Sequence, residues 1–540
     1  MSKTRVWFYS LLTGSAYSLS VSNLLEGFQW GIFAWIVFLP LHRILLDVQP
    51  GRAFLRGWLA GFFAFTGTMY WVVVAMHLYG HVPLPISIAL MFLLTVYLGL
   101  FIGLYAWGFV WMEHRWRAMA WIMAPCLWVT LEFLRTYAFS GLPWGLLGYS
   151  QFQWLEIIQI ANITSVYGVS FLIVLVNVAL FRLLRWALAK PKIRANVIQP
   201  WKPLAVASAV LLLVWLYGYF SLPEPGTPHS QTLRVGVVQA NINQARKWDT
   251  AYQMDTLSRY ARLTASVSGQ SDVVIWPEAA TPFLFEQENG YQSLVVEMVQ
   301  NAQVPLVFGS PALRRHSDGT PYLLNSAYVL TPEGKITGRY DKQHLVPFGE
   351  YIPLKNILFF LEKLVVGIGD FQAGPGPTLL SLPESSKYRQ AQFGVAICYE
   401  VIFPDLVRQL AKAGSNFLVT ITNDAWFGDT VAPYQHFAMV VFRAVENRMA
   451  FARAANTGIS GFIDSQGAIL AATPIFTERA LTATIPLGQP STFYTRFGDV
   501  FAWACVIISV FLLLFTRFFR KPTAVDTIFQ HPSPRQQTKE

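Results

Sequence analysis

The amino-acid sequence predicts an integral membrane protein in which a bundle of about eight membrane-spanning helices carries one α/β domain outside the membrane. Composition is the first reason: 54% of the 540 residues are hydrophobic and only 13% are charged, which is too apolar for an ordinary soluble surface. The second reason is a series of apolar windows of about 20 residues, the length that crosses a hydrocarbon core of roughly 30 Å. The third is a polar region of strand-like and helix-like runs that follows the seventh window.

The expected spans form two groups, seven before residue 222 and one near the carboxyl terminus. They cover residues 6–22, 26–42, 57–76, 86–111, 117–134, 162–181, 203–221 and 499–516. One of these stretches could instead be a re-entrant or interfacial helix, because hydropathy does not separate these cases. The first span follows Lys3 and Arg5 as a signal peptide would, but the second follows at once with no clear cleavage site, so we expect the first to be retained.

Lysine and arginine residues mark one side of the expected bundle. With the amino terminus inside, the inner segments are rich in Lys and Arg, whereas the three short outer loops between the first six spans contain only Arg135. This bias predicts cytoplasmic termini and a polar domain on the periplasmic side of a bacterial inner membrane. The net charge of +10 is then explained by orientation and by contact with anionic lipid, so we expect no nucleic-acid binding.

The sequence divides into four expected regions. Residues 1–221 hold seven spans, 222–490 form the outer domain, 491–521 hold the eighth span, and 522–540 form a polar, disordered cytoplasmic tail. In the outer domain, runs rich in Val, Ile and Phe predict strands at 234–239, 272–276, 306–309, 326–330, 393–397, 416–421 and 461–464. Helix-length segments lie at 251–267, 290–302, 404–413 and 433–450. Some neighbouring strands lack a helix between them, which indicates a mixed sheet.

Glu278, Lys342 and Cys398 each lie at or next to the end of an apolar run of the outer domain. In open α/β sheets ligands usually bind at the edge where strands end, so we expect the three side chains to share a pocket. A thiol must lose its proton to attack a carbonyl, a carboxylate can take that proton, and an ammonium can stabilise the developing oxyanion. Taken singly, each residue also fits a structural role: a turn glutamate, a solvated loop lysine and a core cysteine.

Cys398 is the one cysteine expected outside the membrane, because Cys126 and Cys505 fall inside expected spans. It therefore has no evident disulfide partner, and a lone thiol in an oxidising compartment is either buried and inert or reactive. The sequence contains no P-loop, no GxGxxG segment and no spacing of histidines or cysteines typical of a metal site.

Together, the three residues resemble those of the nitrilase superfamily, in which Glu, Lys and Cys occur in this order in a WPE motif, a lysine loop and a CYE-like strand end. The segments KQHLVPFGEY at 342–351, CYE at 398–400 and NDAWFG at 423–428 further resemble the apolipoprotein N-acyltransferases of that superfamily. So do the multi-span amino-terminal half and the final returning span, and the resemblance covers nearly the whole chain. It implies a nitrilase-like α-β-β-α sandwich for the outer domain.

The resemblance also implies site residues. The family's nucleophile falls on Cys398, its general base on Glu278 and its oxyanion-stabilising lysine on Lys342. The supporting positions are Trp248, Glu350, Tyr399, Glu400 and Trp426. The two tryptophans could shape an acyl or phospholipid pocket or only pack, and the two glutamates could orient the lysine and a substrate amine or only form buried ion pairs. Residues 141–151 could lie against a lipid entrance or form an aromatic belt, and the apolar segment 357–371 could dip into lipid and gate entry.

The reaction that the resemblance implies is acyl transfer in two steps. The cysteine takes a fatty acyl chain from a phospholipid, expected to be phosphatidylethanolamine, and the α-amino group of diacylglyceryl-cysteine in an apolipoprotein attacks the thioester. No metal or organic cofactor is expected. A membrane-tethered amidase that uses water as acceptor would share the three residues, and a transporter or non-catalytic lipid-binding protein would share the spans, so these alternatives stay open at this point.

Overall fold

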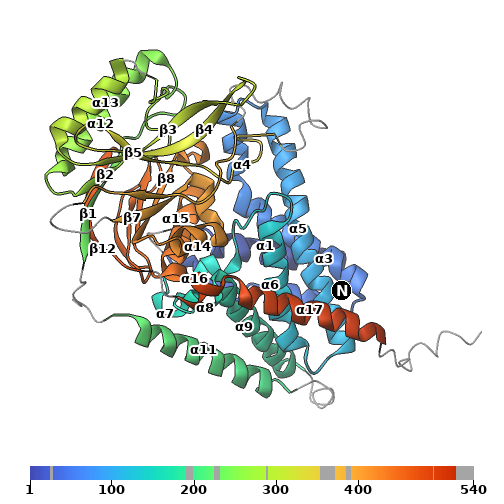
Figure 1. The fold of residues 1–540 in the computed structure, drawn as a ribbon. Helices are drawn as coiled ribbons and strands as arrows, with labels where there is room; N and C mark the ends of the chain where they lie inside the picture. Colours follow the sequence, from blue (N-terminus) through green and yellow to red (C-terminus); the bar gives the residue numbers. More distant parts are fainter. Residues whose placement is uncertain are drawn as a thin grey trace, which may run out of the picture.

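The computed structural model describes residues 1–24, 28–189, 199–223, 231–287, 290–352, 371–384, 391–489 and 492–518. It consists of a helical bundle with a layered α/β domain packed against it (Figure 1). The expected tail at 522–540 and all but the last residue of the segment 357–371 lie outside the described residues.

Helical structure forms at each expected span. The bundle contains α1 (Lys3–Ser20), η1 (Trp30–Ile36), α2 (Leu39–Ile44), α3 (Pro50–Met69), α4 (Trp71–Val74), η2 (Ala75–Tyr79), α5 (Leu84–Arg115), α6 (Ala120–Tyr137), α9 (Val166–Ala187), α11 (Trp201–Ser221) and α17 (Val500–Phe518). Between α6 and α9 lie η3 (Leu147–Gln151), α7 (Leu155–Ile158) and α8 (Ala161–Thr164). The stretch at 26–42 contains short helical pieces instead of one long helix, because Pro40 has no N–H to continue the hydrogen-bond ladder from η1.

Three helices within the described ranges are long and apolar enough to cross a membrane: α5, α9 and α11. Helix α3 and the segment Trp71–Tyr79 would make a fourth span, bent by 48°. Shorter apolar helices lie at Trp30–Ile44 and Val500–Leu514. The structure therefore supports a membrane bundle with three or four clear spans, and the count of eight remains a prediction.

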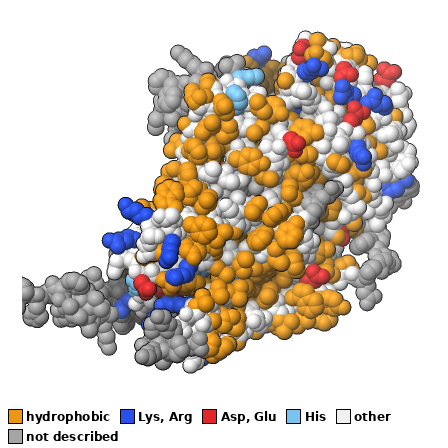
Figure 2. All heavy atoms as spheres, turned by 180° about the vertical axis from the view of Figure 1, so that it is seen from behind, with side chains coloured by type: hydrophobic (Ala, Val, Ile, Leu, Met, Phe, Trp, Pro, Cys, Tyr) orange, Lys and Arg blue, Asp and Glu red, His pale blue; other side chains and the backbone are white. Residues whose placement is uncertain are grey.

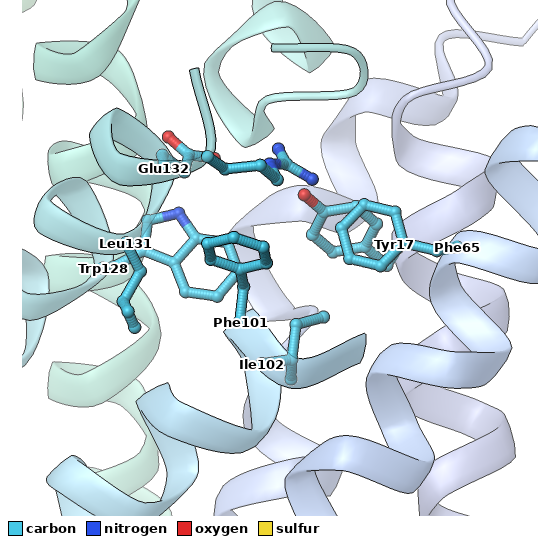
Figure 3. Close-up of a pocket in the computed structure, with 8 residues that line it drawn as sticks. Tyr17, Phe65, Phe101, Ile102, Trp128, Leu131 and Glu132 are labelled. Carbon is cyan, nitrogen blue, oxygen red and sulfur yellow. The ribbon is translucent and has the colours of Figure 1, made fainter. Parts of the chain in front are cut away.

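Arg135 lies in the last turn of α6 and is 2% exposed, which corrects the prediction that it belongs to an outer loop. It lines a pocket of the bundle (Figure 3) together with Tyr17, Phe65, Phe101, Ile102, Trp128, Leu131 and Glu132. Two of these polar side chains hold the loop that follows α6. Glu132 accepts a hydrogen bond from the backbone N of Leu147 at 2.7 Å, and the Tyr17 hydroxyl donates to the carbonyl of Gly145 at 2.8 Å. The bundle interior thus fixes the position of residues 141–151.

The α/β domain contains two six-stranded sheets. In the first, the order β12-β1-β2-β3-β4-β5 is formed by β12 (Arg479–Pro486), β1 (Thr232–Gln239), β2 (Val273–Ile275), β3 (Leu306–Arg315), β4 (Pro321–Leu330) and β5 (Ile336–Asp341). In the second, the order β11-β10-β9-β8-β7-β6 is formed by β11 (Ile469–Ala472), β10 (Gly461–Ile463), β9 (Phe451–Ala455), β8 (Phe417–Thr422), β7 (Gln392–Ile397) and β6 (Leu379–Ser381). Each sheet has three parallel strands in its middle and antiparallel strands outside them, so the predicted mixed sheet is confirmed.

The alternation of side chains along the strands divides this domain into four layers. Val235 and Ile275 of the first sheet share one core with Val395 of the second sheet. On the other face of the first sheet, Val274 and Phe308 pack in the same cluster as residues of the helices α12 (Gln253–Ser268) and α13 (Gly290–Ala302). Helices α14 (Pro404–Lys412) and α15 (Ala432–Asn447) cover the second sheet, which completes the expected α-β-β-α sandwich (Figure 1).

Helix α15 also joins the sandwich to the bundle. All of its residues except Tyr434 are buried, as expected for a helix that is covered on every side. Near its end, a buried ion pair joins Arg443 and Glu446 at 2.9 Å. Glu446 also accepts hydrogen bonds from the Ser165 hydroxyl at 2.7 Å and from the backbone N of Val166 at 3.0 Å, at the start of α9. The two halves of the chain therefore share one continuous, hydrogen-bonded interface.

The outer surface of the bundle is apolar. Figure 2 shows hydrophobic side chains spread over the helical part, while charged side chains gather on the α/β domain at the upper right and at the lower left edge. Leu93 on α5, Leu213 on α11 and Ile507 on α17 are among the most exposed of these hydrophobic residues. An apolar belt of this size is typical of a surface that faces lipid.

Helices α3 and α5 pack through small residues, as is common between membrane helices. A Cβ atom at Gly61 would lie 2.9 Å from the backbone of Gly99, whereas one at Gly51, near the start of α3, would meet nothing within 4 Å. We expect Gly61→Ala to lower the unfolding temperature of the detergent-solubilised protein, because overpacking costs about 1–3 kcal/mol. Gly51→Ala is the matched control and should leave the temperature unchanged. Equal unfolding temperatures for both variants would contradict this packing.

Candidate active site

Glu278 lies just beyond the end of β2, where the chain leaves the first sheet. Its side chain is nearly buried and accepts two hydrogen bonds. Oε1 accepts from the Asn325 side-chain amide at 2.7 Å, and Oε2 accepts from the backbone N of Asn423 at 2.9 Å. Because Asn423 follows β8, the second of these bonds crosses from one sheet to the other. The carboxylate is therefore fixed in the space between the two sheets.

Lys342 directly follows β5 and is 1% exposed. Its ammonium lies 2.9 Å from Oε1 of Glu350 and 3.5 Å from Oε1 of Glu278. Burial alone lowers the pKa of a lysine, but the two carboxylates and the nearby Cys398 more than offset burial and raise the pKa of Lys342 above its ordinary value. The side chain is thus a permanent, buried cation.

Cys398 follows β7 and is the first residue of a short 3₁₀ helix, η6 (Cys398–Ile402). Its φ of +52° is in the left-handed region, which a residue with a side chain occupies at a cost. The sharp turn presents the thiol at the end of the strand. Burial and the carboxylate of Glu278 raise the pKa of this thiol above its ordinary value, against the opposing effect of Lys342. The thiol is therefore protonated at neutral pH and needs a base before it can act as a nucleophile.

The structure thus brings the three expected reactive groups together. Glu278 and Lys342 are in direct ionic contact, and the charges of both act on the thiol of Cys398. This arrangement suits nucleophilic attack on a carbonyl: the thiol can attack, the carboxylate can accept its proton, and the ammonium can stabilise the oxyanion. Among the described residues, no group of three or more His, Cys, Asp or Glu side chains is arranged to hold a metal ion.

Glu400 ties the turn at the nucleophile to the lysine loop. It is fully buried, and it accepts hydrogen bonds from the backbone N of Ile397 at 2.7 Å, from the Tyr340 hydroxyl at 2.8 Å and from the backbone N of Gln343 at 2.6 Å. Burial raises the pKa of Glu400 to about 7, although these hydrogen bonds and Lys342 oppose the increase. Of the two supporting glutamates, Glu350 therefore contacts Lys342 directly, whereas Glu400 fixes the backbone around it.

The other supporting residues lie toward the surface. Trp248 is 51% exposed, and Trp426 is 37% exposed and makes a T-shaped contact with Tyr79 of the bundle, with the ring centroids 6.0 Å apart. The Tyr399 hydroxyl donates to the carbonyl of Gly141 at 3.0 Å. Groups from the bundle half therefore contact Trp426 and Tyr399 directly. The roles of these three aromatic residues remain predictions.

Some residues of the site were not predicted from the sequence. Asn325, which belongs to β4, donates to both Glu278 and Glu350. Nothing in its sequence surroundings distinguishes it from other asparagines. Asn423 belongs to the NDAWFG segment, which the sequence analysis identified only as a motif. Lys247 is buried, and its ammonium donates to the backbone carbonyl of Glu278 at 3.1 Å.

Comparison with known proteins identifies the family of this chain. Two family models match the chain: the apolipoprotein N-acyltransferase N-terminal domain over residues 13–179, and carbon-nitrogen hydrolase over residues 234–492. A protein of Geobacter metallireducens named apolipoprotein N-acyltransferase is 44% identical over 482 residues, which are 88% of this chain and 88% of that protein. The chain belongs to the apolipoprotein N-acyltransferase family. The family resemblance predicted from the motifs is thereby confirmed.

Other relatives carry the same family name. The apolipoprotein N-acyltransferase of Pasteurella multocida is 33% identical, with 91% of this chain and 91% of that protein covered. Among solved structures, an amidase of the nitrilase superfamily from Nesterenkonia AN1 is 20% identical and covers 50% of this chain and 95% of that chain, with a TM-score of 0.37.

Within this family member, the loop at 141–151 lies behind the nucleophile. The Trp144 ring stacks on the ring of His436, with centroids 5.6 Å apart. Nε2 of His436 lies 3.2 Å from the carbonyl oxygen of Cys398, and Nδ1 lies 3.0 Å from Asp424. The bundle, the second sheet and the nucleophile are thus connected through one buried imidazole.

The raised thiol pKa makes a prediction about reactivity. We expect the rate at which iodoacetamide alkylates Cys398, followed by peptide mass spectrometry, to rise with pH around a midpoint above about 8.5, the ordinary thiol value. Only the thiolate reacts, and burial together with Glu278 disfavours the thiolate. The same protein in denaturant provides the control and should show the ordinary midpoint. A midpoint in the folded protein at or below that of the denatured chain would show that this description of the site is wrong.

Proposed function

We propose that this chain transfers a fatty acyl group from a phospholipid to the amino terminus of a diacylated apolipoprotein through a thioester on Cys398. The observation that carries the proposal is the buried ammonium of Lys342, in contact with Glu278 and close enough to the thiol to affect its pKa. Membership of the apolipoprotein N-acyltransferase family supports the substrates, and the apolar bundle beneath the domain supports a lipid donor.

In the first step, the carboxylate of Glu278 accepts the proton of the Cys398 thiol, and the sulfur attacks the ester carbonyl of the phospholipid. The negative charge that develops on the carbonyl oxygen is stabilised by the ammonium of Lys342. The tetrahedral intermediate then collapses: the carbon–oxygen bond of the ester breaks, and Glu278 returns its proton to the leaving alkoxide. The products are a lysophospholipid and a thioester on Cys398.

In the second step, the α-amino group of the diacylated apolipoprotein attacks the thioester carbonyl. Glu278 accepts a proton from the attacking amine, and Lys342 again stabilises the oxyanion. The carbon–sulfur bond breaks, Glu278 returns the proton to the leaving sulfur of Cys398, and an amide is released. No electrons are exchanged with a redox partner in either step, so the residues of the chain suffice for the chemistry.

Supporting residues have separate roles in this proposal. Glu350 compensates the charge of Lys342, and Glu400 holds the lysine loop against the nucleophile turn. Trp248, Tyr399 and Trp426 line the approach to the thiol and contact the acyl chain or the head group. The exposure of Trp248 and Trp426, the position of Tyr399 next to Cys398 and the contacts of Trp426 and Tyr399 with the bundle support this assignment.

The proposal also includes a membrane placement. Residues 1–221 and 491–521 supply about eight spans in a bacterial inner membrane, and residues 222–490 form the periplasmic catalytic domain. Both termini are then cytoplasmic, and residues 522–540 follow the last span. The asymmetry of Lys and Arg and the exposed apolar side chains of α5, α11 and α17 support this placement. Phosphatidylethanolamine is the proposed donor.

The reaction is tested with labelled phospholipid and a synthetic diacylated lipopeptide in detergent. The unaltered protein should form the labelled amide only when the lipopeptide amine is free. Cys398→Ala should lower the rate by at least about 10³-fold, because the nucleophile is lost. Cys126→Ala changes a thiol that lies inside α6 and is the matched control, which should keep its activity.

Three results would contradict the proposed function. Absence of any acyl-thioester on Cys398 after incubation with phospholipid would favour the membrane-tethered amidase, which needs no lipid, and release of free fatty acid at the same rate with and without the lipopeptide would show that water is the acceptor. Full transfer by Cys398→Ala would show that the thioester route is wrong.

A further inference from the structure

A second buried lysine, Lys247, lies beside the proposed catalytic residues. It belongs to the segment between β1 and α12 and is 3% exposed, although its neighbours from Ala245 to Thr250 are all exposed. A lysine on such a segment could extend its ammonium into solvent at little cost. Instead, Nζ points inward and donates to the backbone carbonyl oxygen of Glu278 at 3.1 Å. The chain therefore turns this one cation toward the site.

The charges of the site explain why a second cation is favourable there. The carboxylates of Glu278 and Glu350 and the ammonium of Lys342 together leave one uncompensated negative charge in a largely buried space. A charge removed from water is costly unless it is paired. The ammonium of Lys247 brings the sum of these four groups to zero, while nearby Asp424 is paired with Arg453 and Glu400 is hydrogen-bonded to the lysine loop. This balance persists when a proton passes from the thiol to Glu278, because the negative charge then moves to the sulfur.

Electrostatic interactions connect Lys247 with both reacting groups. Burial lowers the pKa of Lys247 to about 8, while the charges of Glu278 and Cys398 oppose that decrease. Lys247 is thus mostly charged at neutral pH, and its charge favours a negative sulfur. The two buried lysines differ in their contacts. The ammonium of Lys342 lies 2.9 Å from a carboxylate oxygen of Glu350, whereas the described interactions of Lys247 include no carboxylate oxygen, only the backbone carbonyl of Glu278.

We propose that Lys247 is a positioning residue of the catalytic centre, which holds the backbone of Glu278 and stabilises the thiolate of Cys398 through its positive charge. The proposal rests on the roles assigned above to Glu278 and Cys398. It adds a second cation to the Glu-Lys-Cys set, supplied by the loop after the first strand of the domain.

The test is the pH dependence of Cys398 alkylation by iodoacetamide in the full-length protein, located by peptide mass spectrometry. Lys247→Met removes the charge, and we expect alkylation to be about tenfold slower at pH 7, with the difference disappearing above about pH 9, where Lys247 of the unaltered protein is itself neutral. Lys247→Gln keeps a hydrogen-bond donor without the charge and should behave like Lys247→Met, whereas Lys247→Arg should restore most of the rate. Lys335→Met removes an exposed lysine from a turn and should leave the profile unchanged.

Acyl transfer gives a second readout. Lys247→Met should lower kcat about tenfold with little change in KM for the phospholipid, because the charge acts on the nucleophile and not on lipid binding. An alkylation profile of folded Lys247→Met and Lys247→Gln that superimposes on that of the unaltered protein overturns the proposal. If Cys398→Ala retains transfer, the proposed function fails instead, so the two failures are distinguishable.

If both variants fail to fold, the proposal can still be tested on the unaltered protein by comparing two alkylating reagents. The ratio of Cys398 alkylation by anionic iodoacetate to that by neutral iodoacetamide cancels the titration of the thiol itself. Glu278, Lys342, Glu350, Glu400 and Asp424 also face this space, and the raised pKa of Lys342 keeps it charged throughout. Because Glu400 has a pKa of about 7, the ratio is compared between pH 8 and pH 9.5, where Glu400 is already ionised. We expect the ratio to fall over this range as Lys247 loses its proton, and a constant ratio overturns the proposal.

Discussion

One buried ammonium, held between two carboxylates, is the interaction on which the proposed catalytic centre depends. Lys342 is almost completely removed from solvent, and a lone charge in such a place would cost several kcal/mol. Glu350 and Glu278 compensate that charge, and they come from different segments of the first sheet. These contacts therefore fix three segments together: the residues around Lys342, the end of β2 and the loop at 346–350. A cation that is stable only in this arrangement is also one that is already in place when an oxyanion forms.

The two sheets complete the site because hydrogen bonds cross between them in both directions. Glu278 from the first sheet accepts from the backbone of Asn423 beyond β8, and Glu400 beyond β7 accepts from the backbone of Gln343 beyond β5. The hydrogen bonds that join the two sheets are consequently the same bonds that hold the reactive groups in place. The bundle reaches this joint as well, because Trp144 stacks on His436 behind Cys398 and Glu446 binds the start of α9. The helical half of the chain thus contacts the segments that hold the proposed catalytic residues.

The strands that the sequence predicted are largely those buried on both faces. β7 and β8 are continuous apolar runs, as is typical of central parallel strands in a layered domain. β12 and β5 were not predicted, because each is partly exposed and carries polar residues between its apolar ones. The short edge strands β6 and β11 are mostly half-buried or exposed and were not predicted, whereas the equally short β2 and β10 are fully buried and were predicted. Arg135 was placed outside the membrane because a charge usually ends a span, whereas here the bundle accommodates it.

The site was predictable only where a motif surrounds the residue. Glu278, Lys342 and Cys398 were identified from their flanking residues, and the family they indicate is confirmed. Asn325 and Lys247 could not be found in this way, because their importance comes from contacts made between segments far apart in the sequence. A lysine between exposed neighbours is ordinarily a surface residue, and only the folded chain shows that it is buried.

The most direct test is the mass of the peptide that contains Cys398 after the purified protein has been incubated with a phospholipid and no acceptor. The thioester route predicts an added acyl mass on that peptide, removable by hydroxylamine and absent from Cys398→Ser. An acyl group found on another residue, or transfer to a lipopeptide without any adduct on Cys398, would contradict it.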